Sequence, residues 1–289
     1  MAYPNTDTTL LRLMPRVLRA RDFHLYLENG KRLTDLWRCG GRAVLGHKPP
    51  KVLVELKNAA ERGLFTPLPH PMEGRFLKAL AQIFPGRTFR LYMDENSLRR
   101  ALAEAGFENV PLWRPFLRDQ GLGIRDWRIG NGDQGHCSLS EHDSPQSLTP
   151  SPLSVPVLPW PLGPAVLVLG KDMEDSFPPS ELIPPVLLAP AARALHNLAA
   201  ALKTFDPNDD WPKYPKIKKA LAQTEGHWRR HGIYLTVDPD MDTMKYETLF
   251  RRFLEGGFLL PPSPHEPAIL PLSMSAGEES KLAQLLVKQ

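Results

Sequence analysis

The fold of this 289-residue chain is decided by the stretch Leu25-Tyr-Leu-Glu-Asn-Gly-Lys-Arg-Leu-Thr-Asp35, followed by Gly41-Arg-Ala-Val-Leu-Gly-His47-Lys-Pro49. Apolar and polar residues alternate on both sides of Asn29-Gly30, and an Asn-Gly pair between alternating segments predicts a β-hairpin. The second part ends in Gly46-His47 and a proline, which favours a turn that leads into a helix.

Outward from this stretch, helical and strand patterns follow one another to the end of the chain. Apolar periodicity predicts helices over 51–62, 71–83, 97–106, 190–204, 213–231 and 243–255 and from 277 onward, and strands over 88–93, 165–169, 232–237 and 258–260. Asp94 and Ser97 are both suitable N-caps for the helix near residue 97. Strands that alternate with helices indicate an α/β or α+β protein.

Proline divides the chain. Its 31 residues are about twice the average share. They concentrate between Pro145 and Pro164 and between Pro178 and Pro190, so this middle region is expected to lack a continuous helix or a central strand. We expect extended connections around a few short elements there.

Composition excludes several classes of protein. Lys+Arg number 36 against 32 Asp+Glu, an excess that is small and spread along the chain, so nucleic acid is not an expected partner. Cys39 and Cys137 have no disulfide or zinc-ribbon spacing, which suits a reducing, cytoplasmic location. No apolar run is long enough to span a membrane, so no membrane association is expected.

A second stretch, near the other end, strengthens the first: Phe250-Arg-Arg-Phe-Leu-Glu-Gly-Gly-Phe-Leu-Leu-Pro-Pro-Ser-Pro-His-Glu266. Together the two resemble the opening and closing segments of class III (fold-type I) pyridoxal-phosphate aminotransferases, and of glutamate-1-semialdehyde aminomutase in particular. In those enzymes a hairpin leads into "L-G-H-x-x-P-x-V", and "F-x-x-L-L-x-x-G-V-x-L-P-P-S-x-x-E" precedes the last helix.

The resemblance implies an α/β, fold-type I architecture. A small α+β domain would be built from both chain ends, 1–92 and 206–289, around a reduced large domain over 93–205 with proline-rich linkers. The chain is much shorter than a full-length member, and the deficit falls between Gly106 and Pro185. Because these enzymes are dimers, the resemblance also implies a homodimer, with a small-molecule ligand as a further expected partner.

The cofactor cradle departs from the family pattern. Family enzymes carry "N-S-G-T-E-A" at the start of the first large-domain helix, where backbone N–H groups bind the cofactor phosphate. Here the sequence is Met93-Asp-Glu-Asn-Ser-Leu-Arg-Arg-Ala101, so Asn96 and Ser97 are the candidate phosphate contacts. Two carboxylates, Asp94 and Glu95, stand where an anion should bind, which predicts poor phosphate affinity.

One lysine is the candidate for the cofactor. The segment from Ile183 to Leu195 resembles the helix that follows the catalytic lysine in the family, which makes Lys171 the candidate Schiff-base lysine. No clear counterpart of the family's "E-P" strand or of its "D-E-V-x-x-G-x-R" strand is present. The leading hypothesis is therefore an aminotransferase-like binding or assembly protein with no bound cofactor. The competing hypothesis is an active pyridoxal-phosphate aminotransferase or aminomutase that uses Lys171.

Two further groups of residues carry side chains of the types that bind metals. His227 and His231 would lie on one face of the helix predicted over 213–231, and His136-Cys137 with His142 offers zinc-type donors, but neither has the spacing of a known site, so no metal is expected. The basic run Lys213 to Lys219 leaves open a third reading, a small-molecule or nucleic-acid module.

Overall fold

The computed structural model describes residues 9–107, 110–117, 128–129, 152–205, 213–224, 226–238 and 241–287. The chain divides into two compact units. Unit 1 comprises residues 1–48, 116–118 and 205–289, and unit 2 comprises 49–115 and 119–204. The division after Lys48 lies well before the boundary expected after residue 92. The reason is that the helices between these points pack against the long helix of unit 2.

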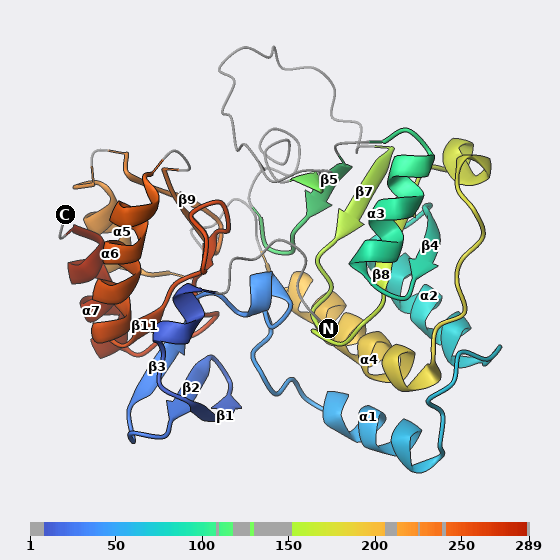
Figure 1. Ribbon diagram of the computed structural model, residues 1–289, viewed down its shortest axis with the longest axis horizontal. Helices are drawn as coiled ribbons and strands as arrows, with labels where there is room; N and C mark the ends of the chain where they lie inside the picture. The colour runs from blue at the N-terminus through green and yellow to red at the C-terminus, as the bar shows by residue number, and fades with distance from the viewer. Residues whose placement is uncertain are drawn as a thin grey trace. The chain divides into compact units, whose positions relative to one another are not determined.

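Unit 1 is α+β (Figure 1). Its elements are η1 (Leu10–Leu13), β1 (Val17–Arg21), β2 (His24–Leu27), β3 (Arg32–Asp35), η2 (Cys39–Gly41), α5 (Pro215–Leu221), β9 (Trp228–His231), β10 (Tyr234–Val237), α6 (Thr243–Glu255), β11 (Phe258–Leu259), β12 (Ala268–Ile269) and α7 (Ala276–Val287). The predicted hairpin is confirmed as β2 and β3, with Gly30 at a φ of 77° in its turn.

Both chain ends share the sheets of unit 1. One sheet has the order β1-β2-β3-β11, in which β11 pairs parallel to β3 with Phe258 opposite Thr34. The other has the order β12-β10-β9, and the Ile269 N–H of its β12 donates to the Leu36 carbonyl. Residues from both chain ends, 1–48 and 205–289, thus belong to the same compact unit.

Unit 2 is α/β. Its elements are α1 (Val52–Glu61), α2 (Met72–Ile83), β4 (Thr88–Tyr92), α3 (Glu95–Glu104), β5 (Val110–Trp113), β6 (Arg128–Ile129), β7 (Leu153–Pro156), β8 (Ala165–Leu169), η4 (Lys171–Ser176) and α4 (Pro185–Leu202). They build a five-stranded sheet with the order β4-β8-β7-β5-β6. The edge strand β4 pairs antiparallel with β8, from Thr88 opposite Leu169 to Tyr92 opposite Ala165.

Alternate residues of these strands feed two separate cores. Leu91 and Val166 face the layer of α1, α2 and α4, whereas Tyr92 and Leu167 face α3. Every residue of β8 is buried, as its wholly apolar sequence predicts for a strand covered on both faces. Each such large side chain contributes about 1.5–3 kcal/mol on burial, which fixes the β4–β8 register.

Three predictions about the elements were wrong in part. The helix expected over 213–231 ends at Leu221, because 228–231 pairs with β10 as a hairpin around Gly232, whose φ is 63°. The helix expected from residue 190 begins at Pro185, a proline suited to a first turn. The proline-rich region also contains a central strand, β7, with its proline at the last position.

Candidate functional site

The first candidate site is the turn from β4 into α3, where the sequence places a phosphate cradle. Asp94 is extended, with φ −153° and ψ 178°, and is the N-cap of α3. Its Oδ1 accepts the Ser97 N–H at 2.9 Å, as a capping aspartate does. The candidate contacts Asn96 and Ser97 thus lie in the first turn of α3, but the Ser97 amide is already bonded to a carboxylate of the chain itself.

A second carboxylate reaches the same turn from a distant segment. Glu181 lies in the connection between η4 and α4, and its Oε2 accepts the Met93 N–H at 2.6 Å. Two further bonds fix this connection along the outer edge of β4: Leu91 N–H donates to Ser180 Oγ at 3.0 Å, and Glu181 N–H donates to the Leu91 carbonyl at 2.8 Å. Glu95 is the second acid expected from the sequence, whereas Glu181, 88 positions away from Met93, was not expected at this turn.

Tyr92 adds a buried phenol beside this turn. It is 2% exposed, and its hydroxyl has no hydrogen-bond partner among the described residues. Burial raises the pKa of the Tyr92 phenol, Arg90 opposes this rise, and the Glu181 carboxylate adds to it. The phenol therefore stays protonated beside Glu181 at neutral pH.

Lys171 lies at the other end of the β4–β8 pair. It begins η4, two residues beyond Leu169, which pairs with Thr88 at the start of β4. The α3 turn follows Tyr92, at the end of the same strand, and four residue steps at about 3.3 Å separate the two ends by about 13 Å. The Arg90 side chain, on β4, keeps η4 near this strand by donating to the Glu174 carbonyl at 2.8 Å. The structure does not bring Lys171 together with Asn96 and Ser97.

The solvent exposure of the lysines shows whether any other lysine could form the imine with the cofactor. A lysine that forms an imine must lose its proton, and proteins favour the neutral amine by desolvating it or by placing it next to another cation. Every lysine among the described residues is exposed. Those of unit 2 are Lys51, Lys57, Lys78, Lys171 and Lys203. The described residues therefore do not fit pyridoxal phosphate: the Ser97 amide and the neighbouring Met93 amide donate to carboxylates of the chain, and no described lysine is desolvated.

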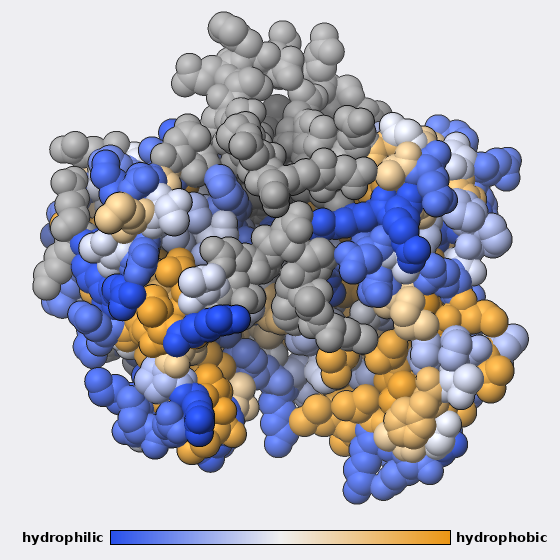
Figure 2. Space-filling view, in the orientation of Figure 1, coloured by the Kyte–Doolittle hydropathy of each residue, from blue (hydrophilic) through white to orange (hydrophobic). Residues whose placement is uncertain are grey.

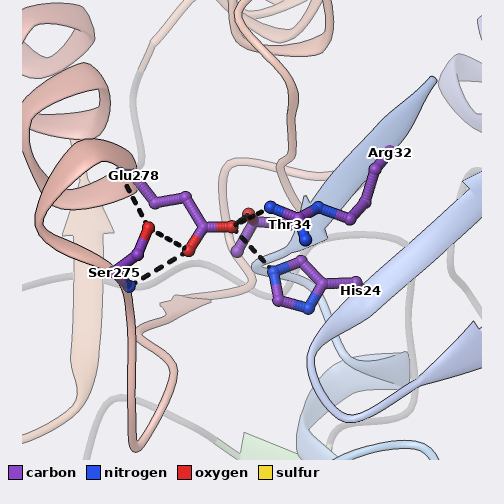
Figure 3. A network of polar contacts seen from close by, with 5 residues as sticks. All are labelled: His24, Arg32, Thr34, Ser275 and Glu278. Carbon is purple, nitrogen blue, oxygen red and sulfur yellow. Dashed lines mark hydrogen bonds and ion pairs between the residues drawn. The ribbon is translucent and has the colours of Figure 1, made fainter.

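The polar clusters of unit 1 tie its two halves together (Figure 3). Glu278, in the first turn of α7, accepts from His24 at 2.8 Å, from Arg32 at 3.1 Å and from the Ser275 hydroxyl at 2.7 Å. Burial alone would raise the pKa of Glu278, but the hydrogen bonds from Ser275 and His24 outweigh burial and lower the pKa to about 2. The cluster is a structural clasp between the chain ends.

A second cluster surrounds Arg38, which is fully buried with a φ of 49°. Its guanidinium donates to the carbonyls of Asp35, Val44 and Ile269, each at 3.2 Å. Burial lowers the pKa of Arg38 to about 10, against the attraction of Asp35. His47, from the Gly-His turn, contacts the Asp35 carboxylate at 2.9 Å. The bonds from Arg38 satisfy buried backbone carbonyls of unit 1.

The remaining candidates are not assembled into sites. His227 and His231 do not share a helix, because His231 belongs to β9 and His227 precedes it. Residues 136, 137 and 142 lie outside the described residues. Within the described ranges no group of three or more His, Cys, Asp and Glu side chains could hold a metal ion. No helix in that part of the chain is long and apolar enough to cross a membrane.

Solved structures of aminotransferases share the architecture of this chain. Ornithine δ-aminotransferase of Plasmodium falciparum aligns over 94% of this chain and 92% of its own, with a TM-score of 0.60 and 12% identity. The fold is aminotransferase-like. Acetylornithine aminotransferase of Elizabethkingia anophelis aligns with a TM-score of 0.60 and 10% identity over 94% of this chain and 92% of its own. A glutamate-1-semialdehyde aminomutase of Pseudomonas aeruginosa PAO1 aligns with a TM-score of 0.58 and 14% identity over 94% of this chain and 86% of its own.

Two relatives by sequence cover most of this chain. An uncharacterized protein of Treponema pallidum (strain Nichols) is 27% identical over 286 residues, 91% of each chain. An uncharacterized protein of Borreliella burgdorferi is 23% identical over 281 residues, 96% of this chain and 93% of that protein. No protein-family model matches the sequence. The α/β, fold-type I prediction is thus confirmed at the level of fold.

Proposed function

We propose that this chain is an aminotransferase-like protein that does not perform pyridoxal-phosphate catalysis and acts as a binding or assembly protein. The observation that carries the proposal is the separation of the two halves that a cofactor site needs. Lys171 lies at the start of β4, and the helix N-terminus for the phosphate lies at its end. The exposure of every described lysine supports the same reading.

The proposed assembly is a homodimer through an apolar face of unit 2. Along α1 and the segment that follows it, Val54 is 56% exposed, Phe65 60% and Leu68 59%. Figure 2 shows hydrophobic residues on the visible face over the α1 and α4 region. Exposed apolar residues gathered on one face mark protein interaction sites more often than random surface. Self-association would remove them from water.

The competing function is transamination or aminomutation with pyridoxal phosphate on Lys171. The likeness of the fold to ornithine and acetylornithine aminotransferases is the observation in its favour. Against it stand the exposure of Lys171 and its distance from Asn96 and Ser97.

A cofactor titration separates the two functions. Purified protein is mixed with increasing pyridoxal phosphate at neutral pH, and the visible absorbance of a protein imine is recorded for the wild type and for Lys171→Ala. We expect no saturable band and no difference between the two proteins. A saturable band that Lys171→Ala removes would place the cofactor on Lys171 and favour the competing function. A saturable band that persists in Lys171→Ala would place the imine on another lysine and equally refute our proposal.

A further inference from the structure

The turn between β4 and α3 is closed by the chain's own carboxylates. At a helix N-terminus the free N–H groups and the helix dipole attract anions. Here the Ser97 N–H, one of these groups, donates to Asp94 at 2.9 Å, and the Met93 N–H, one residue before the N-cap, donates to Glu181 at 2.6 Å. The two carboxylates thus place two negative charges at the turn where a negatively charged phosphate would have to bind.

The segment that carries Glu181 is adapted to this position. Its neighbours Pro178, Pro179 and Pro184 cannot donate backbone hydrogen bonds, so the segment cannot pair as a regular strand. Side chains replace the missing ladder: Ser180 Oγ serves the Leu91 amide and Glu181 Oε2 serves the Met93 amide. The segment thus covers the edge strand β4 and places the Glu181 carboxylate at the turn into α3.

We infer that the carboxylates of Asp94 and Glu181 take the place of a cofactor phosphate at the start of α3, so that the protein excludes phosphorylated ligands from this turn by an internal contact. The inference deepens the proposed function and rests on it for the premise that no cofactor needs this turn. It also means that any small-molecule ligand of the protein binds elsewhere or lacks a phosphate.

The test follows the Met93 and Ser97 amides by NMR while inorganic phosphate is added at constant ionic strength. Asp94→Asn with Glu181→Gln removes both charges, and each new side chain keeps an oxygen that can accept the same amide, so the turn keeps its hydrogen bonds. We expect no saturable shift in the wild type. In the double variant we expect saturable shifts, with a phosphate affinity about thirtyfold or more above that of the wild type, the effect of removing two unit charges about 4 Å away in water.

A matched control makes the same change of charge at the other end of β4. Asp172→Asn with Asp175→Asn should leave both amides as unresponsive as in the wild type, because these exposed acids contact neither amide. Saturable phosphate shifts in the wild type at the same concentration as in the double variant would overturn the inference. Absence of binding in both proteins would also overturn it, since the carboxylates would then not be the cause of exclusion.

Repeating the titration with pyridoxine 5′-phosphate, which has no aldehyde, separates this inference from the proposed function. Binding of this compound at Met93 and Ser97 of the wild type would refute the inference without any imine being formed. An imine on wild-type protein with silent Met93 and Ser97 amides would refute the proposed function and leave the inference standing.

Discussion

The Glu278 carboxylate lies 2.8 Å from His24 Nε2, and this contact joins the start of α7 to β2 across 254 positions of the chain. The same carboxylate accepts from Arg32 of β3, so a single side chain binds the N-terminal hairpin to the C-terminal helix (Figure 3). The stability of unit 1 therefore depends on contacts between residues that are far apart in the sequence.

Glu278→Gln is expected to lower the free energy of unfolding by about 2 kcal/mol at pH 7, the usual cost of losing hydrogen bonds to a charged group. The folded pKa of about 2 lies below the ordinary value of 4.5, so the contribution of Glu278 is complete above about pH 4.5 and is lost as the pH falls toward 2. Urea unfolding at several pH values measures this.

The matched control is Glu247→Gln. Glu247 forms an exposed pair with Arg251 at 2.6 Å on α6, and exposed pairs contribute little. A difference between wild type and Glu278→Gln that stays constant down to pH 2 would contradict the account of the clasp.

Arg38→Met is expected to destabilise the protein by roughly 3 kcal/mol or more, because three buried carbonyls lose their donor while the side-chain volume is nearly kept. Thermal and chemical unfolding measure the loss. Arg21→Met is the control: Arg21 is exposed and pairs with its neighbour Asp22 at 3.5 Å, so a change within about 0.5 kcal/mol is expected. Equal effects of the two substitutions would contradict the role of Arg38.

Phe65→Glu combined with Leu68→Glu is expected to weaken self-association at least about tenfold, because both side chains would carry charge into an apolar contact. Sedimentation equilibrium over a range of concentrations measures the dimer constant. Met244→Glu is the matched control, since Met244 is 78% exposed on α6 of unit 1. A wild-type protein that is monomeric throughout, or a dimer that the double variant leaves intact, would refute this interface.

Local patterns predicted much of the fold. Strand 165–169 and helix 243–255 match β8 and α6 at both ends, because a fully apolar strand and a capped amphipathic helix are specified by their own residues. The strand predicted over 232–237 corresponds to β10, but its hairpin partner β9 was missed because the basic sequence from Lys213 onward has helical periodicity. Gly232, just before an alternating apolar segment, was the signal of a turn.

The candidate site could be predicted only in part. Asp94 was expected as an N-cap and the structure confirms it, since capping depends on neighbours in sequence. Glu181 could not be foreseen, because its contact with Met93 arises from the path of a proline-rich segment along a sheet edge. The position of Lys171 relative to α3 depends in the same way on the antiparallel pairing of β4 and β8, which no local pattern specifies.

The most direct test of the central claim is to add pyridoxal phosphate, reduce with borohydride, and count and map the adducts by mass spectrometry at increasing cofactor concentration. The account predicts slow, non-saturating labelling spread over exposed lysines, with Lys171 labelled no faster than Lys78 or Lys203. A single adduct per chain that saturates on one lysine would contradict it.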